Sequence, residues 1–328
     1  MALNPITRRR ERLKRERQEA RAAKRARKLA RRPKPMPFVV GVNRSGTTLL
    51  RMMLDSHPEL AVPPETHFVP ALFKTMQDAK NKGERMTPEE TTAFLVEHRR
   101  WGDFGLDPNA LEERIASLKQ MRPKFVLRAF YSLYAEGQGK PRYGDKTPGY
   151  VKQMGMVQRS LPEARFIHLI RDGRDVALSR EDRSDAEVLT VERHALIWKR
   201  RISRARGQVE RLNHYTEIRY EDLVHDPEAA LRKICEFIEL PYDPTMLDYH
   251  ERSAERLQEI ARDLDDDDGG ALRPAAERLE AHSLVTEAPR EDRVERWRKL
   301  MPPEDIATFE EIAGDLLEEL GYELSTKS

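Results

Sequence analysis

The sequence has a single cysteine among its 328 residues and contains no long apolar run. One cysteine cannot form a disulfide within the chain and is compatible with a reducing compartment, so we expect a cytoplasmic location. No apolar stretch approaches the roughly 20 residues that span a bilayer, and the first residues lack the apolar segment of a secretory signal. We therefore expect no transmembrane segment. Cys235 lies in the amphipathic stretch EAALRKICEFIEL and is predicted to be a buried core thiol.

Acidic residues are scarce at the N-terminus: residues 1–35 hold 15 Lys and Arg against 3 Glu, whereas the remainder holds 44 basic and 54 acidic residues. This segment has almost no apolar stripe, so it cannot pack onto a core as an amphipathic helix would. We expect a separate N-terminal arm, disordered or partly helical, that ends at the prolines of RRPKPMP. Its charge suits peripheral contact with an anionic membrane or an acidic partner. The oligomeric state stays open.

Segments with strand-like and helical patterns alternate from Met36 onwards. ARFIHLIRD and TEIRYEDL are predicted strands, and helical periodicity runs through residues 67–137 and 187–212. Such alternation is typical of a mainly parallel sheet covered by helices on both faces. Residues 36–324 are therefore predicted to form one α/β domain, a P-loop-type three-layer fold with helical insertions. Residues 251–295 are charged and broken by Gly and Pro, and we expect them to form a mobile surface region.

The stretch FVVGVNRSGTTLL joins a predicted strand to a predicted helix through a G-x-x-x-x-G turn from Gly41 to Gly46. This is the frame of a phosphate-binding loop, but Thr47 occupies the position where nucleotide-hydrolysing loops have a lysine. The backbone N–H groups of residues 43–48 and the N-terminus of the following helix still favour an anion. Arg44 adds a guanidinium group suited to phosphate or sulfate. The loop therefore predicts an anion site that needs no metal.

Two further polar clusters, residues 143–148 and 171–179, follow strand-like segments in the same way as residues 43–48. Ligands of open α/β sheets bind beyond the carboxyl ends of the strands. We therefore expect the three clusters to meet at one edge of the sheet. Arg171, at the end of FIHLIRD, indicates a second anion pocket at that edge.

Together, GVNRSGTTLLRMMLDSHPEL, DKTP and FIHLIRDGRDVALS resemble the sulfotransferases that use 3′-phosphoadenylyl sulfate (PAPS), above all the tyrosylprotein branch and its bacterial relatives. The resemblance covers residues 37–240, and more weakly ERWRKLM and LLEELGY near the C-terminus. It implies that PAPS is the donor and that no metal is needed. It also implies which residues bind the donor: Arg44, Ser45, Gly46, Thr47 and Thr48 at the 5′-phosphosulfate, Arg171 and Ser179 at the 3′-phosphate, and Tyr220 of RYEDL nearby.

Sulfuryl transfer needs a base for the acceptor proton and positive charge on the departing oxygen. PPETHF offers Glu65 and His67 for the first role. The resemblance to the tyrosylprotein branch implies Glu65 as the base, with His67 as the alternative. Lys146 of GDKTP matches the family lysine that stabilises the leaving group. Glu65, Lys146 and Arg44 are therefore the predicted catalytic residues.

The predicted function is in-line transfer of a sulfuryl group to a hydroxyl acceptor, which is a small molecule, a glycan, a lipid or a protein tyrosine. The sequence departs from the animal tyrosylprotein enzymes around VPPETHF, in its cysteine content and in having no apparent membrane anchor, and this leaves the acceptor open. Two other functions stay open. A P-loop kinase acting on a small molecule would require ATP and Mg²⁺, and a non-catalytic nucleotide-binding protein would bind the donor without turnover.

Overall fold

The computed structural model describes residues 33–182, 189–264 and 274–325. The basic arm predicted over residues 1–35 therefore lies almost wholly outside the described residues. The elements below belong to the unit that begins at Pro35.

Four parallel strands form the central sheet in the order β4–β1–β5–β6. Their bounds are Met36–Gly41 for β1, Asp145–Lys146 for β4, Ala164–Ile170 for β5 and Tyr215–Arg219 for β6. Parallel neighbours require crossover connections, and helices supply them here. A second sheet of two parallel strands pairs β2 (Leu60–Ala61) with β3 (Arg142–Tyr143). The predicted α/β fold with a mainly parallel sheet is confirmed.

The remaining described elements are helical. The α-helices are α2 (Thr47–Ser56), α3 (Val69–Asn81), α4 (Pro88–Val96), α5 (Pro108–Ala116), α6 (Pro123–Gly137), α7 (Met154–Ser160), α8 (Gly173–Glu181), α9 (Val191–Arg206), α10 (Tyr220–His225), α11 (Pro227–Phe237), α12 (His250–Leu257), α13 (Ala275–Glu280), α14 (Trp297–Leu300) and α15 (Pro303–Glu319). The 3₁₀ helices are η1 (Trp101–Phe104), η2 (Pro148–Lys152), η3 (Val209–Arg211), η4 (Pro244–Met246), η5 (Gln258–Ile260), η6 (Ser283–Thr286) and η7 (Glu291–Arg293).

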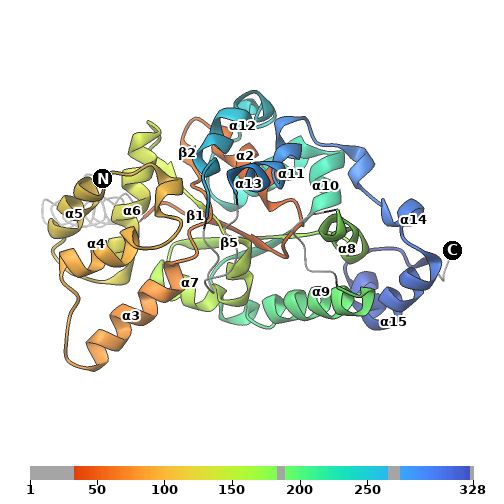
Figure 1. Cartoon of the computed structure of the whole chain (residues 1–328), viewed down its shortest axis with the longest axis horizontal. Helices are drawn as coiled ribbons and strands as arrows, with labels where there is room; N and C mark the ends of the chain where they lie inside the picture. Colours follow the sequence, from red (N-terminus) through yellow and green to blue (C-terminus); the bar gives the residue numbers. More distant parts are fainter. Residues whose placement is uncertain (1–32, 183–188, 265–273, 326–328) are drawn as a thin grey trace, which may run out of the picture. The chain divides into compact units, whose positions relative to one another are not determined.

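Both faces of the sheet are buried because successive side chains of a strand point to opposite sides. Phe38 and Phe166 belong to the core cluster formed with α3 to α7, whereas Val39 and Ile167 belong to the cluster formed with α2 and α10 to α12. A third cluster joins the end of β5 to α8, α9 and α15. Figure 1 shows β1 and β5 between helices α2 and α10 on one side and helices α7 and α9 on the other. These are the three predicted layers.

Three local predictions can be compared with the described elements. The predicted strand TEIRYEDL is a strand only as far as Arg219, because α10 begins at Tyr220. The long helix predicted over residues 187–212 is α9, Val191–Arg206. Cys235 is 1% exposed and its Sγ lies 3.7 Å from Sδ of Met246. Burial raises the pKa of this thiol to about 11. The prediction of a core thiol is confirmed.

Residues 251–295 differ from the expected surface region. Their described parts form α12, η5, α13, η6 and η7, and the side chains of Leu257, Ile260 and Val285 are buried in the core cluster beside α2. The apolar side chains that anchor this segment are spaced widely among charged residues, so its composition resembles that of a loop. Residues 265–273, which include four consecutive aspartates at 265–268, lie outside the described residues.

A buried arginine ties the start of α8 to the C-terminal helix α15. Arg174 has no exposed surface, and its guanidinium contacts Asp172 at 2.7 Å and Glu310 at 2.6 Å. The guanidinium carbon also lies 3.4 Å from the ring centroid of Trp297. Since both carboxylates are buried as well, this cluster depends on the positive charge at its centre.

We expect Arg174→Met to lower the free energy of unfolding by about 3–5 kcal/mol, because it leaves two buried carboxylates without their counter-charge. Arg232→Met is the matched control, since Arg232 pairs with Glu228 at 2.7 Å on the surface and exposed pairs contribute about 1 kcal/mol or less. Urea unfolding followed by circular dichroism measures both. If both variants lowered the free energy of unfolding by the same small amount, the buried cluster would not contribute the stability that we expect of it.

Candidate functional site

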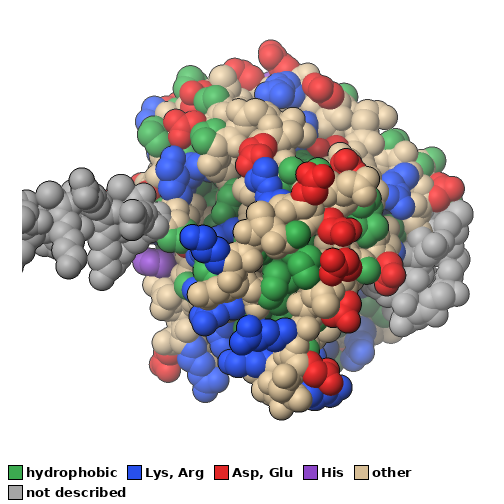
Figure 2. Space-filling view, turned by 90° about the vertical axis from the view of Figure 1, so that its left-hand side faces the viewer, with side chains coloured by type: hydrophobic (Ala, Val, Ile, Leu, Met, Phe, Trp, Pro, Cys, Tyr) green, Lys and Arg blue, Asp and Glu red, His purple; other side chains and the backbone are tan. Residues whose placement is uncertain are grey.

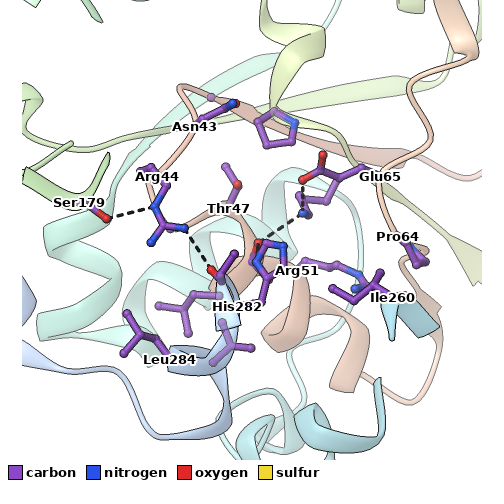
Figure 3. A pocket seen from close by; sticks show the side chains of 18 of the residues that line it. Asn43, Arg44, Thr47, Arg51, Pro64, Glu65, Ser179, Ile260, His282 and Leu284 are labelled. Atoms are coloured by element: carbon purple, nitrogen blue, oxygen red, sulfur yellow. Dashed lines mark hydrogen bonds and ion pairs between the residues drawn. The ribbon is translucent and has the colours of Figure 1, made fainter. Parts of the chain in front are cut away.

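A cavity of about 530 Å³ lies at the carboxyl ends of the central strands. It receives residues from the loop after β1, from the chain after β2, from β4 and from the β5–α8 junction (Figure 3). The predicted meeting of clusters 43–48, 143–148 and 171–179 at one edge is therefore what the structure shows. Of the predicted site residues, all but one line this cavity: Arg44, Gly46, Thr47, Thr48, Glu65, His67, Lys146, Arg171, Ser179 and Tyr220.

The loop after β1 needs glycine at its last position. Gly46 has a φ of 86°, in the left-handed region, and a Cβ there would lie 2.4 Å from the ring of Tyr220. Arg44 also has a positive φ, 76°. This turn directs the chain from the buried strand into α2, whose first N–H groups have no partner within the helix. The site thus has a helix N-terminus facing the cavity, as the sequence predicted.

Ser45 is the predicted site residue that the structure does not bring to the cavity wall. It is fully buried, and its N–H donates to the carbonyl of Val42 at 3.1 Å. Its Oγ is buried without a hydrogen-bond partner. The hydroxyl is therefore buried and unpaired, and it does not line the cavity.

Arg171 lies between β5 and α8, and Ser179 lies in the second turn of α8; both line the cavity. Ser179 Oγ accepts a hydrogen bond from Arg44 Nε at 3.1 Å. Arg171 is stacked on Tyr220, with its guanidinium carbon 4.5 Å from the ring centroid, and Trp198 Nε1 donates to its carbonyl at 3.0 Å. The Nε of Arg171 is buried without a hydrogen-bond partner. Arg171 and Ser179, the residues predicted for the second anion pocket, therefore lie next to the first anion site at residues 43–48.

Glu65 and Lys146 form an ion pair of 2.7 Å at the other end of the loop, and Lys146 Nζ also donates to Thr48 Oγ1 at 3.3 Å. His67 Nε2 lies 2.8 Å from the second carboxylate oxygen of Glu65. Burial by itself would raise the pKa of Glu65, but the charge of Lys146 and the contacts with His67 and Arg100 outweigh it and set this pKa well below its usual value. Glu65 is therefore a carboxylate at neutral pH.

A buried polar network fixes the segment that carries Glu65. The backbone N–H of Thr66 donates to Thr147 Oγ1 at 3.0 Å, and its hydroxyl donates to Asp145 at 2.7 Å. Tyr131 donates to the same oxygen of Asp145 at 2.8 Å. Asp145 and Lys146 are the two residues of β4, so one short strand positions both the segment after β2 and the lysine that pairs with its carboxylate.

Arg51 and His282 are two of the cavity residues that sequence reasoning missed. Arg51, one turn after Thr47 on α2, contacts Glu259 at 2.7 Å, and the helical period could have pointed to it. His282 approaches Thr48, with 3.3 Å between Nδ1 and Oγ1 (Figure 3). Burial lowers the pKa of His282 to about 3, and the charge of Lys146 adds to the effect, so the ring is neutral. No local pattern marks His282, which comes from the segment expected to be a surface region.

The segment around His282 also binds the two anion-site arginines. Arg44 Nη1 donates to the carbonyl of Ala281 at 3.1 Å, and Arg171 Nη2 donates to the carbonyl of Arg293 at 2.6 Å. Backbone carbonyls of the segment from α13 to η7 thus accept hydrogen bonds from both Arg44 and Arg171.

Within residues 33–182, 189–264 and 274–325, no group of three or more His, Cys, Asp or Glu side chains is arranged to hold a metal ion. Over the same residues, no helix is long and apolar enough to cross a bilayer.

Comparison with known proteins gives consistent results. The family model of the sulfotransferase family matches residues 35–244. The chain is 28% identical over 299 residues to protein-tyrosine sulfotransferase A of Caenorhabditis elegans, covering 89% of this chain and 68% of that protein. It is 27% identical over 236 residues to the Drosophila melanogaster protein-tyrosine sulfotransferase, covering 67% of this chain and 41% of that protein. The sulfotransferase domain of the Synechococcus PCC 7002 olefin synthase shares the fold, with a TM-score of 0.56 at 24% identity over 89% of this chain and 96% of that domain.

The Asp145 network predicts a pH-dependent stability. Burial raises the pKa of Asp145 to about 6, although hydrogen bonds from Thr66 and Tyr131 oppose the shift. The unfolded value is roughly 3.9, so the folded chain binds this proton more tightly, and the contribution to stability is lost as the pH rises from about 4 to about 6. Asp145→Asn removes the titration.

We therefore expect the free energy of unfolding of the wild type, relative to Asp145→Asn, to fall by about 2–3 kcal/mol between about pH 4 and pH 7. Urea unfolding of both proteins at several pH values measures this difference. A difference that stays constant over the range would show that Asp145 does not titrate there.

Proposed function

The chain belongs to the sulfotransferase family, a family of sulfuryl-transfer enzymes, and on that premise we propose how its residues move a sulfuryl group from PAPS to a hydroxyl acceptor. The observation that carries the proposal is the adjacency of two anion sites and a carboxylate–lysine pair in one cavity. A donor with a 5′-phosphosulfate and a 3′-phosphate needs two anion sites, and transfer to a hydroxyl needs a base beside the first of them.

The donor fits an unpaired group of the cavity. Arg171 Nε is a buried donor without a hydrogen-bond partner, and leaving such a group unsatisfied is costly. A phosphate oxygen would satisfy it. We assign the 5′-phosphosulfate to the start of α2, with Arg44, Gly46, Thr47 and Thr48, and the 3′-phosphate to Arg171 and Ser179. Tyr220 supports this arrangement by packing against both Gly46 and the Arg171 guanidinium.

The reacting groups are assigned to the Glu65–Lys146 end of the cavity. Glu65 accepts the proton of the acceptor hydroxyl as the acceptor oxygen bonds to sulfur and the bond from sulfur to the bridging phosphate oxygen breaks. Lys146 and Arg44 provide positive charge for the oxygen that departs with the phosphate. The low pKa of Glu65 keeps it deprotonated before the reaction, and Thr66 fixes its position through Asp145.

The acceptor is proposed only as a hydroxyl compound. The relatives from Caenorhabditis and Drosophila are named for protein tyrosine, so a phenolic hydroxyl is the first acceptor to test. We place it beside Glu65 and His67, where the cavity wall also includes Arg100 and Gly149.

The donor assignment predicts a specific pattern of ligand binding. Adenosine 3′,5′-bisphosphate should raise the melting temperature far more than ADP or ATP with Mg²⁺, because only the first has a 3′-phosphate for Arg171 and Ser179. Arg171→Ala should weaken binding of the bisphosphate roughly tenfold to a hundredfold, the cost of about 1.5–3 kcal/mol for a charge-assisted hydrogen bond. Thermal-shift titration measures both effects.

Ser179→Ala is the milder companion variant, since it removes a hydroxyl without unpairing the buried contacts of Arg171. Lys233→Ala, an exposed change on α11, is the control. Equal shifts with ADP and the bisphosphate would remove the donor assignment.

The base assignment predicts separate effects on rate and binding. Glu65→Gln keeps the size of the side chain but cannot accept a proton in the same way, so kcat should fall about 10²–10⁴-fold. Affinity for the bisphosphate should change little, because the loop at residues 44–48 is intact. Lys146→Ala should also slow the chemical step, through loss of charge at the departing oxygen.

His67→Gln is the matched control and should have a mild effect. Single-turnover transfer to a simple phenol, with the donor prebound, isolates the chemical step. An active Glu65→Gln together with an inactive His67→Gln would reverse the two roles.

A further inference from the structure

A groove of about 810 Å³, separate from the cavity, lies between α3, the chain from Leu118 to Lys124, and the end of α7. Its floor is apolar: Met76 is buried, and the half-buried side chains of Met86, Leu118 and Met121 pack on the same core cluster. Phe73 adds an aromatic ring, over which the Arg159 guanidinium lies at 5.7 Å.

The rim of this groove carries a strong excess of positive charge. Among the described residues that line it, six are cationic and one, Glu84, is acidic; the cations are Lys80, Arg85, Lys119, Arg122, Lys124 and Arg159. Figure 2 shows the side of the molecule formed by α3 to α6, where Lys and Arg gather in the lower left of the view and acidic side chains lie mainly to the right.

The ion pairs of the described residues leave these cations uncompensated. In the part of the chain that the structure describes, none of the six lies within 4.0 Å of a carboxylate. Glu163, next to the groove residue Pro162, is already paired with Arg128 at 2.6 Å, and Glu84 of the rim is not paired with any of the six. Elsewhere on the surface, Lys199 pairs with Asp315 and Arg290 with Asp292. The unpaired cations of the groove are therefore available to bind an anionic partner.

The folded unit begins beside the groove. The N–H of Met36 donates to the carbonyl of Glu163 at 3.1 Å, and the preceding residue, Pro162, lines the groove. The first residue of β1 therefore lies close to the groove, and residues 1–35, with their 15 Lys and Arg, precede it in the sequence. The rest of the sequence has more acidic than basic residues, so attraction to an anionic surface would be concentrated here.

We propose that this groove docks the protein onto an anionic lipid surface. Cations around apolar side chains are the combination that binds the interface of a bilayer, because the cations meet the headgroups while the apolar groups meet the acyl boundary. Long Lys and Arg side chains without carboxylate partners suit a fluid anionic surface better than a single ligand of fixed shape. The proposal is independent of the sulfuryl-transfer assignment, since no groove residue lines the cavity.

The test is co-sedimentation of the full chain with vesicles of phosphatidylcholine alone or with about 30 mol% phosphatidylglycerol. The groove variant is Lys119→Glu, Arg122→Glu and Lys124→Glu combined. Arg122 precedes α6 and Lys124 lies in its first turn, where acidic side chains favour the helix, so the fold should survive. The matched control reverses three exposed cations elsewhere: Lys233→Glu, Arg252→Glu and Lys299→Glu.

We expect the wild type to bind the phosphatidylglycerol vesicles and not phosphatidylcholine alone, with an affinity that falls as salt is raised. The groove variant should bind at least about tenfold more weakly, a loss that several cations near the surface can account for, whereas the control should bind within about twofold of the wild type. Sulfuryl transfer to a soluble phenol should be unchanged in both.

If the groove variant bound the vesicles as tightly as the wild type does, the proposal would be overturned, and any membrane contact would be assigned to residues 1–35. A groove variant that loses binding to polyglutamate while keeping its vesicle binding would assign the groove to an acidic protein instead.

Discussion

The ion pair between Lys146 and Glu65 is the interaction on which the organisation of the site depends. It joins the edge strand of the central sheet to a segment that follows a different, two-stranded sheet. Two charges at 2.7 Å in a largely buried place are stable only together, because each alone would lack compensation for its lost hydration. The pair therefore fixes the position of the chain after β2 relative to the loop at residues 43–48. Lys146 also contacts this loop directly, through Thr48.

This arrangement is electrostatically prepared in the free protein. The positive groups at the loop, Arg44, Arg51 and Lys146, have fixed partners that set their directions. Preorganised charge of this kind stabilises a transition state without reorganising during the reaction. The contact with Lys146, together with those of His67 and Arg100, also lowers the pKa of Glu65, which keeps the base ionised and makes it intrinsically less basic.

Much of the fold and of the site could be predicted from the sequence because its signals are local. The apolar strands β1 and β5, each followed by polar residues and a helix, predicted where three clusters would meet. Ser45 shows the limit: its place in the motif predicted a donor in the cavity, but the direction of one side chain within a turn depends on packing behind the loop. His282 and the segment from α13 to η7 could not be predicted, since their contacts with the site join residues more than a hundred positions apart in the sequence.

Arg44 and Arg171 each give one hydrogen bond to a carbonyl of that late segment. If a bound anion accepted these hydrogen bonds, it would replace the neutral carbonyls of Ala281 and Arg293 as the acceptor for each arginine. Occupancy of the loop and the conformation of residues 281–293 are then linked equilibria, and each must shift the other by the same free energy. A substitution in this segment, at a residue that does not contact the anion, would therefore change the affinity for the anion by changing how strongly the carbonyls compete for the two arginines.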